Sequence, residues 1–370
     1  MLIYSSLLDC VEPVLTIVAS MSGKSPFLLP MDRKGEASNA HASLLFSYTS
    51  RNNSAKKTYF SDHLAIAHAF DVWIAMYRHE GSQAAYNFCQ KKFLSHSAML
   101  DILDLRENIR SHLVNAGFIS NGSHRRGDVD EDDSDSVDDE LSPEKAPHTM
   151  IVGKGNADSD KKDDSEHSRK RDMNRILCAV CAGLSPNIFR LAEFRRDESK
   201  KSKGSKKGRA KSASEKVLKI VDGGTHTLSI DPPSLLQGKY QQVFDSVTNN
   251  NSADSPRKYG RRRVKDAYYV YHKKVSTTDS MVSIYDCSVI PHAAVLLFGG
   301  DLNLNRTRDK VYVGDWIKMP VNELHAVLFK KLQIEVDSVL QCKVEDPGRD
   351  ITERLSELRD IIDSIMADAD

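Results

Sequence analysis

The spacing of hydrophobic positions changes along the chain. Up to residue 119, apolar residues recur every three or four positions, which is typical of amphipathic helices. In the segment HLAIAHAFDVWIAMYRH, this apolar stripe consists of Leu64, Ala67, Phe70, Ile74 and Tyr77. Ser61 and Asp62 directly precede it and are residue types that cap helices. Two more helices are expected, in AAYNFCQKKF after Gly81 and in AMLDILDLRENIRSHLVNAGF, which stops near Gly117.

From Asn187 the pattern shifts toward short runs of period two. Strands are expected in NIFRLAEF, VLKIVDG, THTLSI, AYYVYHKK, VSIYDC and KVYVGDWIKM. Several short strands separated by loops are typical of a small barrel. The C-terminal segments VNELHAVLFKKLQIEVDSVLQCK and TERLSELRDIIDSIM again favour helices. The sequence therefore predicts an α+β protein: a helical domain, a small β-barrel and C-terminal helices.

One strand combines aromatic residues with lysines. Tyr268, Tyr269 and Tyr271 stand next to Lys273 and Lys274. Aromatic faces beside cations on a sheet suit single-stranded nucleic acid, because bases stack on the rings and the cations neutralise phosphates. A half-buried sheet with lysines at its solvated edge explains the same pattern. The strand alone leaves both interpretations open.

Charges of the two signs are segregated although the net charge is zero. An acidic run spans Asp128–Glu140, and basic runs span Lys200–Lys216 and Arg257–Lys265. Like charges repel, so these runs are expected in loops, where the basic ones can meet RNA or another polyanion. Acidic residues follow Ser134 and Ser136, which fits either phosphorylation or an unmodified, solvated spacer.

Length and composition set further limits. A chain of 370 residues allows about two or three domains, and six cysteines in this length fit a reducing compartment. The apolar segment LIYSSLLDCVEPVLTIVAS lacks a positive leading region and contains Asp9, Glu12 and Pro13, so a core helix is expected there rather than a signal peptide. No segment is long and apolar enough for a transmembrane span of about 20 residues.

Three motifs suggest chemistry that their surroundings do not support. In MSGKS, a phosphate loop needs a glycine five residues before Gly23, where Val18 stands, so a helix end at Gly23 is expected instead. The pair in CAVC, Cys178 and Cys181, has zinc spacing but no second pair nearby, so it is expected in the core. The histidines of the first helix, at positions 63, 68 and 79, are not arranged as metal ligands. No catalytic site and no metal site is predicted.

The order of motifs resembles the C-terminal region of DEAH/RHA-group RNA helicases. LIYSSLLDCVEPVLTIVASMSGKSPFLLP resembles the end of the winged helix running into the ratchet domain, and SDHLAIAHAFDVW resembles the helix that follows. ILCAVCAGLSPNIFRLAEF resembles the passage from the ratchet into an OB-fold, and LSIDPPSL resembles a family turn with Asp231 in place of the usual histidine. YVYHKKVSTTDSMVSIYDCSVIPHAAVLLFGGDL resembles the closing half of the barrel.

The resemblance implies a division of the chain. It implies a winged-helix remnant at 1–8, a helical ratchet (helicase-associated) domain at 9–120, an acidic disordered insertion at 121–171, the last ratchet helix at 172–186, an OB-fold at 187–345 with basic loop insertions at 197–215 and 246–265, and a C-terminal helix at 346–370. The two RecA-like domains of the family would lie upstream. Because Met1 falls inside a family segment, the chain is expected to be a fragment or an isolated C-terminal portion.

The function implied by the resemblance is that of an RNA-binding accessory region, which grips single-stranded RNA for a RecA-type motor in cis or in trans. The family uses ATP and magnesium. This sequence has neither the phosphate loop nor the DEAH box, so it is expected to hold no cofactor and to have no activity alone. Cytoplasm or nucleus is the expected location. The alternative is a non-catalytic interaction module that recruits ribonucleoprotein or ribosomal partners through its charged insertions.

The resemblance also implies site residues. Those expected near the RNA backbone are Tyr271, His272, Lys273, Lys274, Ser276, Thr277 and Thr278. A nonspecific electrostatic contribution is expected from Arg261, Arg262 and Arg263. Ser61, Asp62 and His63 begin the ratchet helix that would face the RNA tunnel, and helix capping explains them equally well.

Overall fold

The computed structural model describes residues 1–49, 56–119, 159–196, 215–223, 227–237, 239, 266–276, 281–305 and 310–368. The acidic run at 128–140, the basic run at 257–265 and most of the basic run at 200–216 lie outside these residues. Thr277 and Thr278 lie outside them as well.

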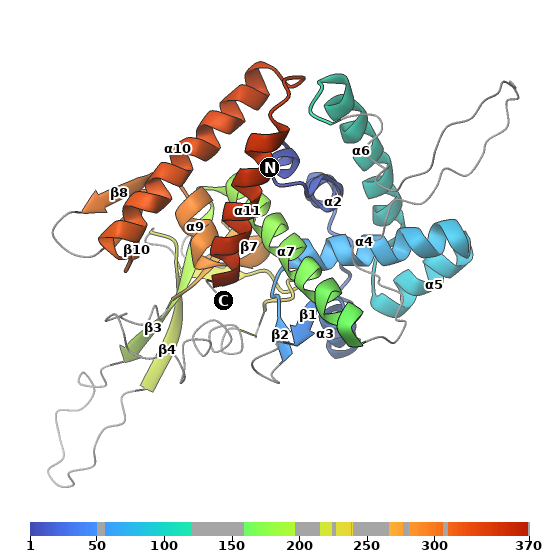
Figure 1. Ribbon diagram of the computed structural model, residues 1–370. Coiled ribbons are helices and arrows are strands. Elements are labelled where there is room, and N and C mark those ends of the chain that lie inside the picture. Colours follow the sequence, from blue (N-terminus) through green and yellow to red (C-terminus); the bar gives the residue numbers. More distant parts are fainter. Residues whose placement is uncertain are drawn as a thin grey trace, which may run out of the picture.

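The N-terminal part is helical, as expected (Figure 1). Its elements are α1 (Leu2–Leu7), α2 (Val11–Ser22), α3 (Lys34–Ala42), β1 (Ser47–Thr49), β2 (Lys56–Thr58), α4 (Asp62–His79), α5 (Ser82–Lys92) and α6 (His96–Asn115). The apolar N-terminal segment forms two helices rather than one, because the chain turns at Asp9, whose φ is 57°. Pro13 sits in the first turn of α2, where its missing N–H costs no helical hydrogen bond. Helix α2 ends at Ser22 with Gly23 as an extended cap residue, which confirms the helix end predicted for MSGKS.

Helix α4 lies at the centre of the helical part. The Ser61 hydroxyl oxygen accepts a hydrogen bond from the backbone N–H of Leu64 at 3.0 Å, so the predicted cap is confirmed. Most of the predicted apolar stripe is buried, and Trp73 is fully buried beside it. Tyr77, the last residue of the stripe, is partly buried and stacks on Trp73 with ring centroids 5.2 Å apart.

Helix α7 (Ser159–Leu184) is longer than the sequence predicts. Residues 159–171 were expected in the disordered insertion, but they extend the helix toward its N-terminus. Lys, Arg and Glu are good helix formers, and lengthening an existing helix avoids the cost of nucleation. Further along, Cys178 and Cys181 are completely buried, and burial raises the pKa of Cys181 to about 12. The core interpretation of CAVC is confirmed.

A five-stranded, nearly closed barrel follows. Its strands are β3 (Ile188–Arg196), β4 (Glu215–Val221), β5 (Thr227–Ile230), β6 (Asp266–Ser276) and β7 (Met281–Ile290), in the order β4-β3-β6-β7-β5. All neighbours are antiparallel except β5 and β7, which are parallel. The outer strands β4 and β5 approach each other, so the sheet curls almost to closure.

Strand β6 is buried on both faces over its first half. Tyr269 and Tyr271 point into the barrel, where Phe189 stacks on Tyr269 with centroids 4.6 Å apart. Tyr268 and Val270 point to the other face and join the core shared with the helices. Because Tyr268 and Tyr269 are at most 1% exposed, the buried-sheet interpretation, one of the two that the pattern left open, applies to these two rings. These rings fill the two cores.

The C-terminal part differs from the expected continuation of the barrel. It contains α9 (His292–Phe298), β8 (Leu302–Asn305), β9 (Lys310–Val313), β10 (Ile317–Met319), α10 (Glu323–Glu345) and α11 (Thr352–Asp368). The segment KVYVGDWIKM, expected to be one barrel strand, is a hairpin that turns at Gly314 with a φ of 57°. With β8 it forms a three-stranded sheet separate from the barrel.

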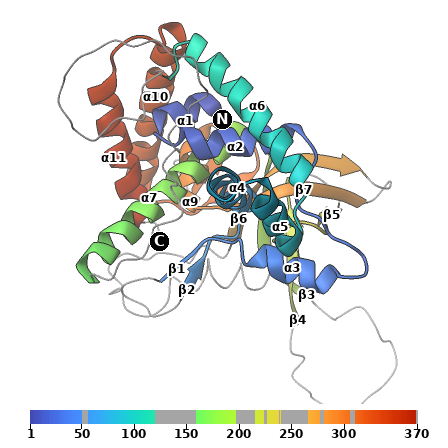
Figure 2. The same cartoon turned by 90° about the vertical axis from the view of Figure 1, so that its right-hand side faces the viewer.

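One continuous core joins the ends of the chain. Figure 2 shows α10 and α11 beside α1 and α7, and all four helices contribute to the same hydrophobic cluster as β6 and α9. Arg175 of α7 and Asp363 of α11 form an ion pair at 2.6 Å. Arg359 of α11 donates a hydrogen bond to the Leu7 carbonyl at 2.6 Å. The C-terminal helix therefore holds the N-terminal helices in place.

The LLFGG run has a physical explanation. A Cβ added at Gly299 would lie 2.5 Å from the Val295 carbonyl oxygen and 3.2 Å from Ile188 of the barrel. Gly300 has a φ of 136°, which other residues rarely adopt. The first glycine thus permits close contact between α9 and the barrel, and the second permits the turn into β8.

We predict that Gly299→Ala lowers the free energy of unfolding by about 1–3 kcal/mol, because the added methyl group clashes with the Val295 carbonyl oxygen of α9 and crowds Ile188 of β3. Gly35→Ala in α3 is the matched control, since a Cβ there meets nothing within 4 Å. This control should raise stability by about 0.5–1 kcal/mol through helix propensity. Urea unfolding of both variants tests the explanation, and equal stability of Gly299→Ala and wild type would contradict it.

Candidate functional site

The N-terminus of α4 is attached directly to barrel strand β7. The Phe60 carbonyl accepts a hydrogen bond from the backbone N–H of Val289 at 2.9 Å. Ser61 and Ser288 form an antiparallel bridge. The first residues of the helix are therefore fixed to the backbone of the barrel.

The Asp62 carboxylate joins two segments of the barrel. Its Oδ2 accepts from the Ser234 hydroxyl at 2.6 Å and from the Cys287 N–H at 2.9 Å, while Oδ1 accepts from the Leu235 N–H at 2.8 Å. Only 6% of Asp62 is exposed. Burial raises the pKa of Asp62 to about 7, although the three hydrogen bonds act in the opposite direction. One side chain of α4 thus holds both β7 and the turn after β5.

Ser61, His63 and Ser288 form a buried chain of hydrogen bonds. Ser288 Oγ lies 2.6 Å from Ser61 Oγ and 2.6 Å from His63 Nδ1. Burial lowers the pKa of His63 to about 4, so the imidazole stays neutral at neutral pH. Its second ring nitrogen, Nε2, is buried and has no hydrogen-bond partner within the described part of the chain.

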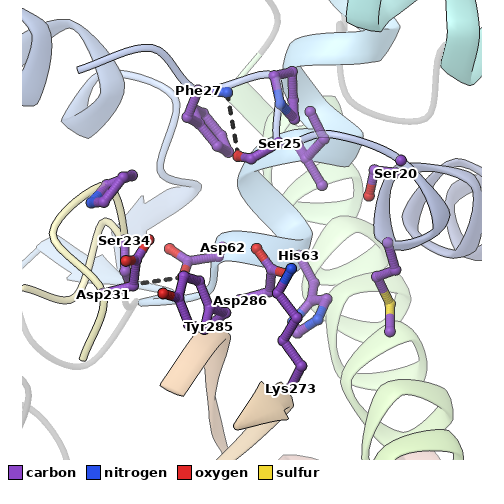
Figure 3. A pocket seen from close by; sticks show the side chains of 15 residues that line it. Ser20, Ser25, Phe27, Asp62, His63, Asp231, Ser234, Lys273, Tyr285 and Asp286 are labelled. Atoms are coloured by element: carbon purple, nitrogen blue, oxygen red, sulfur yellow. Dashed lines mark hydrogen bonds between the residues drawn. The ribbon is translucent and has the colours of Figure 1, made fainter. Parts of the chain in front are cut away.

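A pocket with a volume of about 70 Å³ opens beside these residues. Its walls are the loop after α2, the start of α4, the turn after β5, and strands β6 and β7. Its ionisable lining consists of Asp62, His63, Asp231, Lys273, Tyr285 and Asp286. Figure 3 shows most of these side chains gathered on one side of the pocket, with the loop that carries Ser25 and Phe27 on the other side. We call this space the junction pocket.

Asp286 and His272 form a pair at the edge of the junction pocket, with His272 Nδ1 3.2 Å from Asp286 Oδ2. Burial alone raises the pKa of Asp286, but the hydrogen bond to His272 and nearby positive charge outweigh it, so the pKa is lowered. The φ of Asp286 is 50°, in the left-handed region that Asp and Asn tolerate better than most residues.

The two lysines of β6 have different surroundings. Lys274 Nζ lies 2.6 Å from the carboxylate of Asp222, whose side chain is 7% exposed, so the charge of Lys274 already has a partner. Lys273 has no carboxylate within ion-pair distance among the described residues. Its Nζ lies 5.1 Å from the centroid of the Tyr285 ring, in a cation–π contact. Lys273 is therefore the lysine whose charge is available to a ligand.

The structure brings together only part of the predicted site. His272, Lys273, Lys274 and Ser276 lie on the second half of β6 and are partly or fully exposed, whereas Tyr271 is 8% exposed. Ser61, Asp62 and His63 are at most 6% exposed, and their polar groups contact α4 and the barrel. Their capping and docking roles are visible in the structure, while RNA contacts of either group stay predictions. Arg261, Arg262, Arg263, Thr277 and Thr278 lie outside the described residues.

Sequence reasoning missed Asp231, Tyr285 and Asp286 as parts of this site. The strand VSIYDC was predicted, but its partner was not. Once β6 and β7 pair in antiparallel register, Tyr285 stands opposite Lys273. Asp231 departs from the family turn in the sequence, but the sequence alone assigns it no role. Pairing the two strands as a hairpin would have placed Tyr285 and Asp286 beside the lysines.

The segment MSGKS does not have the structure of a phosphate loop. No strand leads into Gly23, and Lys24 and Ser25 do not begin a helix, so MSGKS cannot cradle phosphates as a phosphate loop does. Within the described ranges, no cluster of His, Cys, Asp or Glu side chains is suited to a metal ion. Within the same ranges, no helix is both long and apolar enough to cross a bilayer.

Comparison with known families and proteins gives matches at both ends of the chain and across most of it. The family described as helicase associated domain (HA2), ratchet-like, matches residues 1–66, and the C-terminal domain in RNA helicases matches residues 309–367. The ATP-dependent DNA/RNA helicase DHX36 of Mus musculus is 27% identical over 349 residues, which cover 94% of this chain and 26% of that protein.

Two further relatives agree. The putative ATP-dependent RNA helicase DHX57 of Homo sapiens is 28% identical over 356 residues, covering 95% of this chain and 21% of that protein. The ATP-dependent RNA helicase DHX29 of Mus musculus is 25% identical over 347 residues, covering 94% of this chain and 19% of that protein. The chain thus spans about a quarter or less of these relatives. The resemblance inferred from the motifs is confirmed, whereas the boundaries of the individual domains stay predictions.

Asp62 and His63 are expected to change the free energy of unfolding with pH in opposite directions. The folded pKa of Asp62, about 7, lies above its ordinary value of 3.8, so its contribution to stability is lost as pH rises through 7. The folded pKa of His63, about 4, lies below 6.5, so its contribution is lost as pH falls through 4. Between these limits the two slopes oppose each other, each by at most about 1.4 kcal/mol per pH unit.

Other groups titrate in the same range, such as Asp71, whose pKa burial raises to about 7, but wild type and variants share them. Relative to wild type, Asp62→Asn should therefore gain stability as pH rises from about 4.5 to about 6.5, and His63→Gln should lose stability over the same window. Urea unfolding at both ends of the window measures the slopes. Parallel profiles for the three proteins would show that neither group titrates as stated.

Proposed function

Because the chain corresponds to the C-terminal accessory region of DEAH/RHA-group RNA helicases, we propose that it binds single-stranded RNA and holds the strand for a RecA-type motor. The motor acts in cis or in trans, since the sequence contains no phosphate loop of its own. ATP and magnesium would belong to that motor, and the described residues of this chain have no step in hydrolysis. We place this activity in the cytoplasm or nucleus.

The observation that carries the proposal is Lys273. It is exposed on the second half of β6, makes no ion pair among the described residues and lies against the ring of Tyr285. An unpaired ammonium group beside a partly exposed aromatic ring offers a phosphate contact and a stacking surface together. Ser276, exposed on the same strand, can donate its hydroxyl to a phosphate oxygen. Contacts of these groups to the RNA backbone do not depend on the base sequence. This suits an RNA strand that must slide through the site.

Lys274 serves a different purpose in this proposal. Its ion pair with the largely buried Asp222 ties β6 to the end of β4. Binding a phosphate would require this ion pair to open or to share its charge. We therefore assign the main electrostatic contact to Lys273 and a supporting role in barrel structure to Lys274.

We predict that Lys273→Ala weakens binding of single-stranded RNA by roughly two- to fivefold, the range expected for one exposed charge contact. The slope of log affinity against log salt should fall by about 0.7, as expected when one phosphate contact is lost. Lys274→Ala should affect affinity less and thermal stability more. The double variant should show both effects, and filter binding at several salt concentrations measures them.

Three results would contradict the proposed function or part of it. Unchanged affinity and salt slope in a folded Lys273→Ala, Lys274→Ala double variant would exclude this strand from RNA binding. Negligible retention of RNA by wild type at physiological salt would favour the alternative function, an interaction module that recruits ribonucleoprotein partners through its charged insertions. RNA-stimulated ATP hydrolysis by the purified chain would contradict the assignment of hydrolysis to a separate motor.

A further inference from the structure

The aromatic ring of Tyr285 is held at both of its ends. Its backbone belongs to β7, where Tyr285 stands directly opposite Lys273 in the antiparallel ladder with β6. Its hydroxyl donates a hydrogen bond to the carboxylate of Asp231, in the turn after β5. Burial and the negative charge of Asp231 raise the pKa of Tyr285, so the hydroxyl keeps the proton that it donates. The ring is therefore fixed by the sheet at one end and by Asp231 at the other.

Asp231 is itself fixed by the barrel and by α4. Its N–H donates a hydrogen bond to the Ile284 carbonyl at 2.9 Å, which continues the parallel pairing of β5 with β7 by one residue. Its carbonyl accepts from the N–H of Ser234 at 3.1 Å, and the Ser234 hydroxyl donates to Asp62 at 2.6 Å. The hydrogen bond to Tyr285 thus comes from a turn that strand β7 and helix α4 both hold in place.

The ring of Tyr285 in turn locates the ammonium group of Lys273. Nζ lies 5.1 Å from the ring centroid, and Figure 3 shows Tyr285 between Asp231 and Lys273. The charge of Lys273 also acts on the carboxylates of Asp231 and Asp286, although it forms no ion pair within the described part of the chain. A lysine held in this way loses less conformational entropy on binding a phosphate than a lysine that moves freely in solvent. Its ammonium group is available and already in place.

We propose that Asp231 is a positioning residue for the RNA contact of Lys273: it holds the ring of Tyr285, and the ring holds the ammonium group where a phosphate of the strand can reach it. This inference rests on the proposed function, because it concerns the lysine to which the phosphate contact is assigned. It also gives a role to the carboxylate that replaces the histidine of the family turn. Charge alone predicts the opposite effect, since a carboxylate beside the strand repels its phosphates.

Two variants of Asp231 separate position from charge. Asp231→Asn and Asp231→Ala both remove the negative charge, but only the amide oxygen of Asn can still accept the hydrogen bond from Tyr285. Asp231→Ala should therefore bind a uridine dodecamer about two- to threefold more weakly than Asp231→Asn, within the range of one exposed cation–π contact. In a Tyr285→Phe background, which keeps the ring but lacks the hydroxyl, the two variants should bind equally. Filter binding at one salt concentration measures the four affinities.

A measurement without RNA reports the position of the lysine directly. The ring current of an aromatic side chain displaces the signals of protons above its face upfield. The protons on Cε of Lys273 should therefore resonate upfield of those of exposed lysines. In protein labelled with ¹³C at lysine Cε, the Lys273 signal is identified by its absence from Lys273→Arg. Its displacement should persist in Asp231→Asn, shrink in Asp231→Ala and disappear in Tyr285→Leu.

Equal RNA affinities, or equal signals of Lys273, in Asp231→Asn and Asp231→Ala would overturn the positioning role while leaving RNA binding intact. A Lys273 signal without upfield displacement in wild type would overturn it as well. If Asp231→Ala does not fold, Tyr285→Phe removes the same hydrogen bond and should weaken RNA binding by the same factor relative to wild type. Failure of wild type to retain RNA would instead remove the proposed function, and the Lys273 signal would still show whether Asp231 positions the lysine.

Discussion

The buried carboxylate of Asp62 is the constraint on which the relation between the helical part and the barrel depends. It accepts hydrogen bonds from Ser234, Leu235 and Cys287, which belong to the turn after β5 and to β7. These segments are far apart in sequence from each other and from α4. Because the acceptor sits at the capped first residue of a helix, its position is fixed by the helix itself. Three walls of the junction pocket, the start of α4, the turn after β5 and strand β7, are the segments that Asp62 joins, so their relative positions depend on this side chain.

The hydrophobic core also holds the helical part against the barrel. Helix α7 and helix α9 pack together against β6 and β7, and α11 packs on α7. Residues from both ends of the chain belong to that one hydrophobic cluster. The C-terminal helices therefore stabilise the helical part and the barrel together, although they contribute no residue to the pocket.

The sequence predicted the elements that have a clear amphipathic period and missed those that do not. Helices α4 to α6 and five barrel strands were expected because one face of each is apolar or because strand residues alternate. Helix α9 was missed, since all residues from Ala293 to Phe298 are buried and a fully buried helix shows no period. For the tyrosines of β6 the pattern left two interpretations open, because a strand covered on both faces shows the same aromatic residues as an exposed one. Asp231 and Asp286 belong to the site only through strand pairing, which no local pattern reveals.

Strand β6 also has a mechanical consequence. It lies between β3 and β7 and forms antiparallel ladders with both, over Ile188–Ala192 on one side and Val282–Ile290 on the other. A load applied along β6 shears both ladders at once, so many hydrogen bonds resist it together rather than breaking one after another. An edge strand pulled away sideways would open like a zipper at a much smaller force. RNA held at Lys273, as proposed, would load β6 along its own length, the direction in which its two ladders resist together.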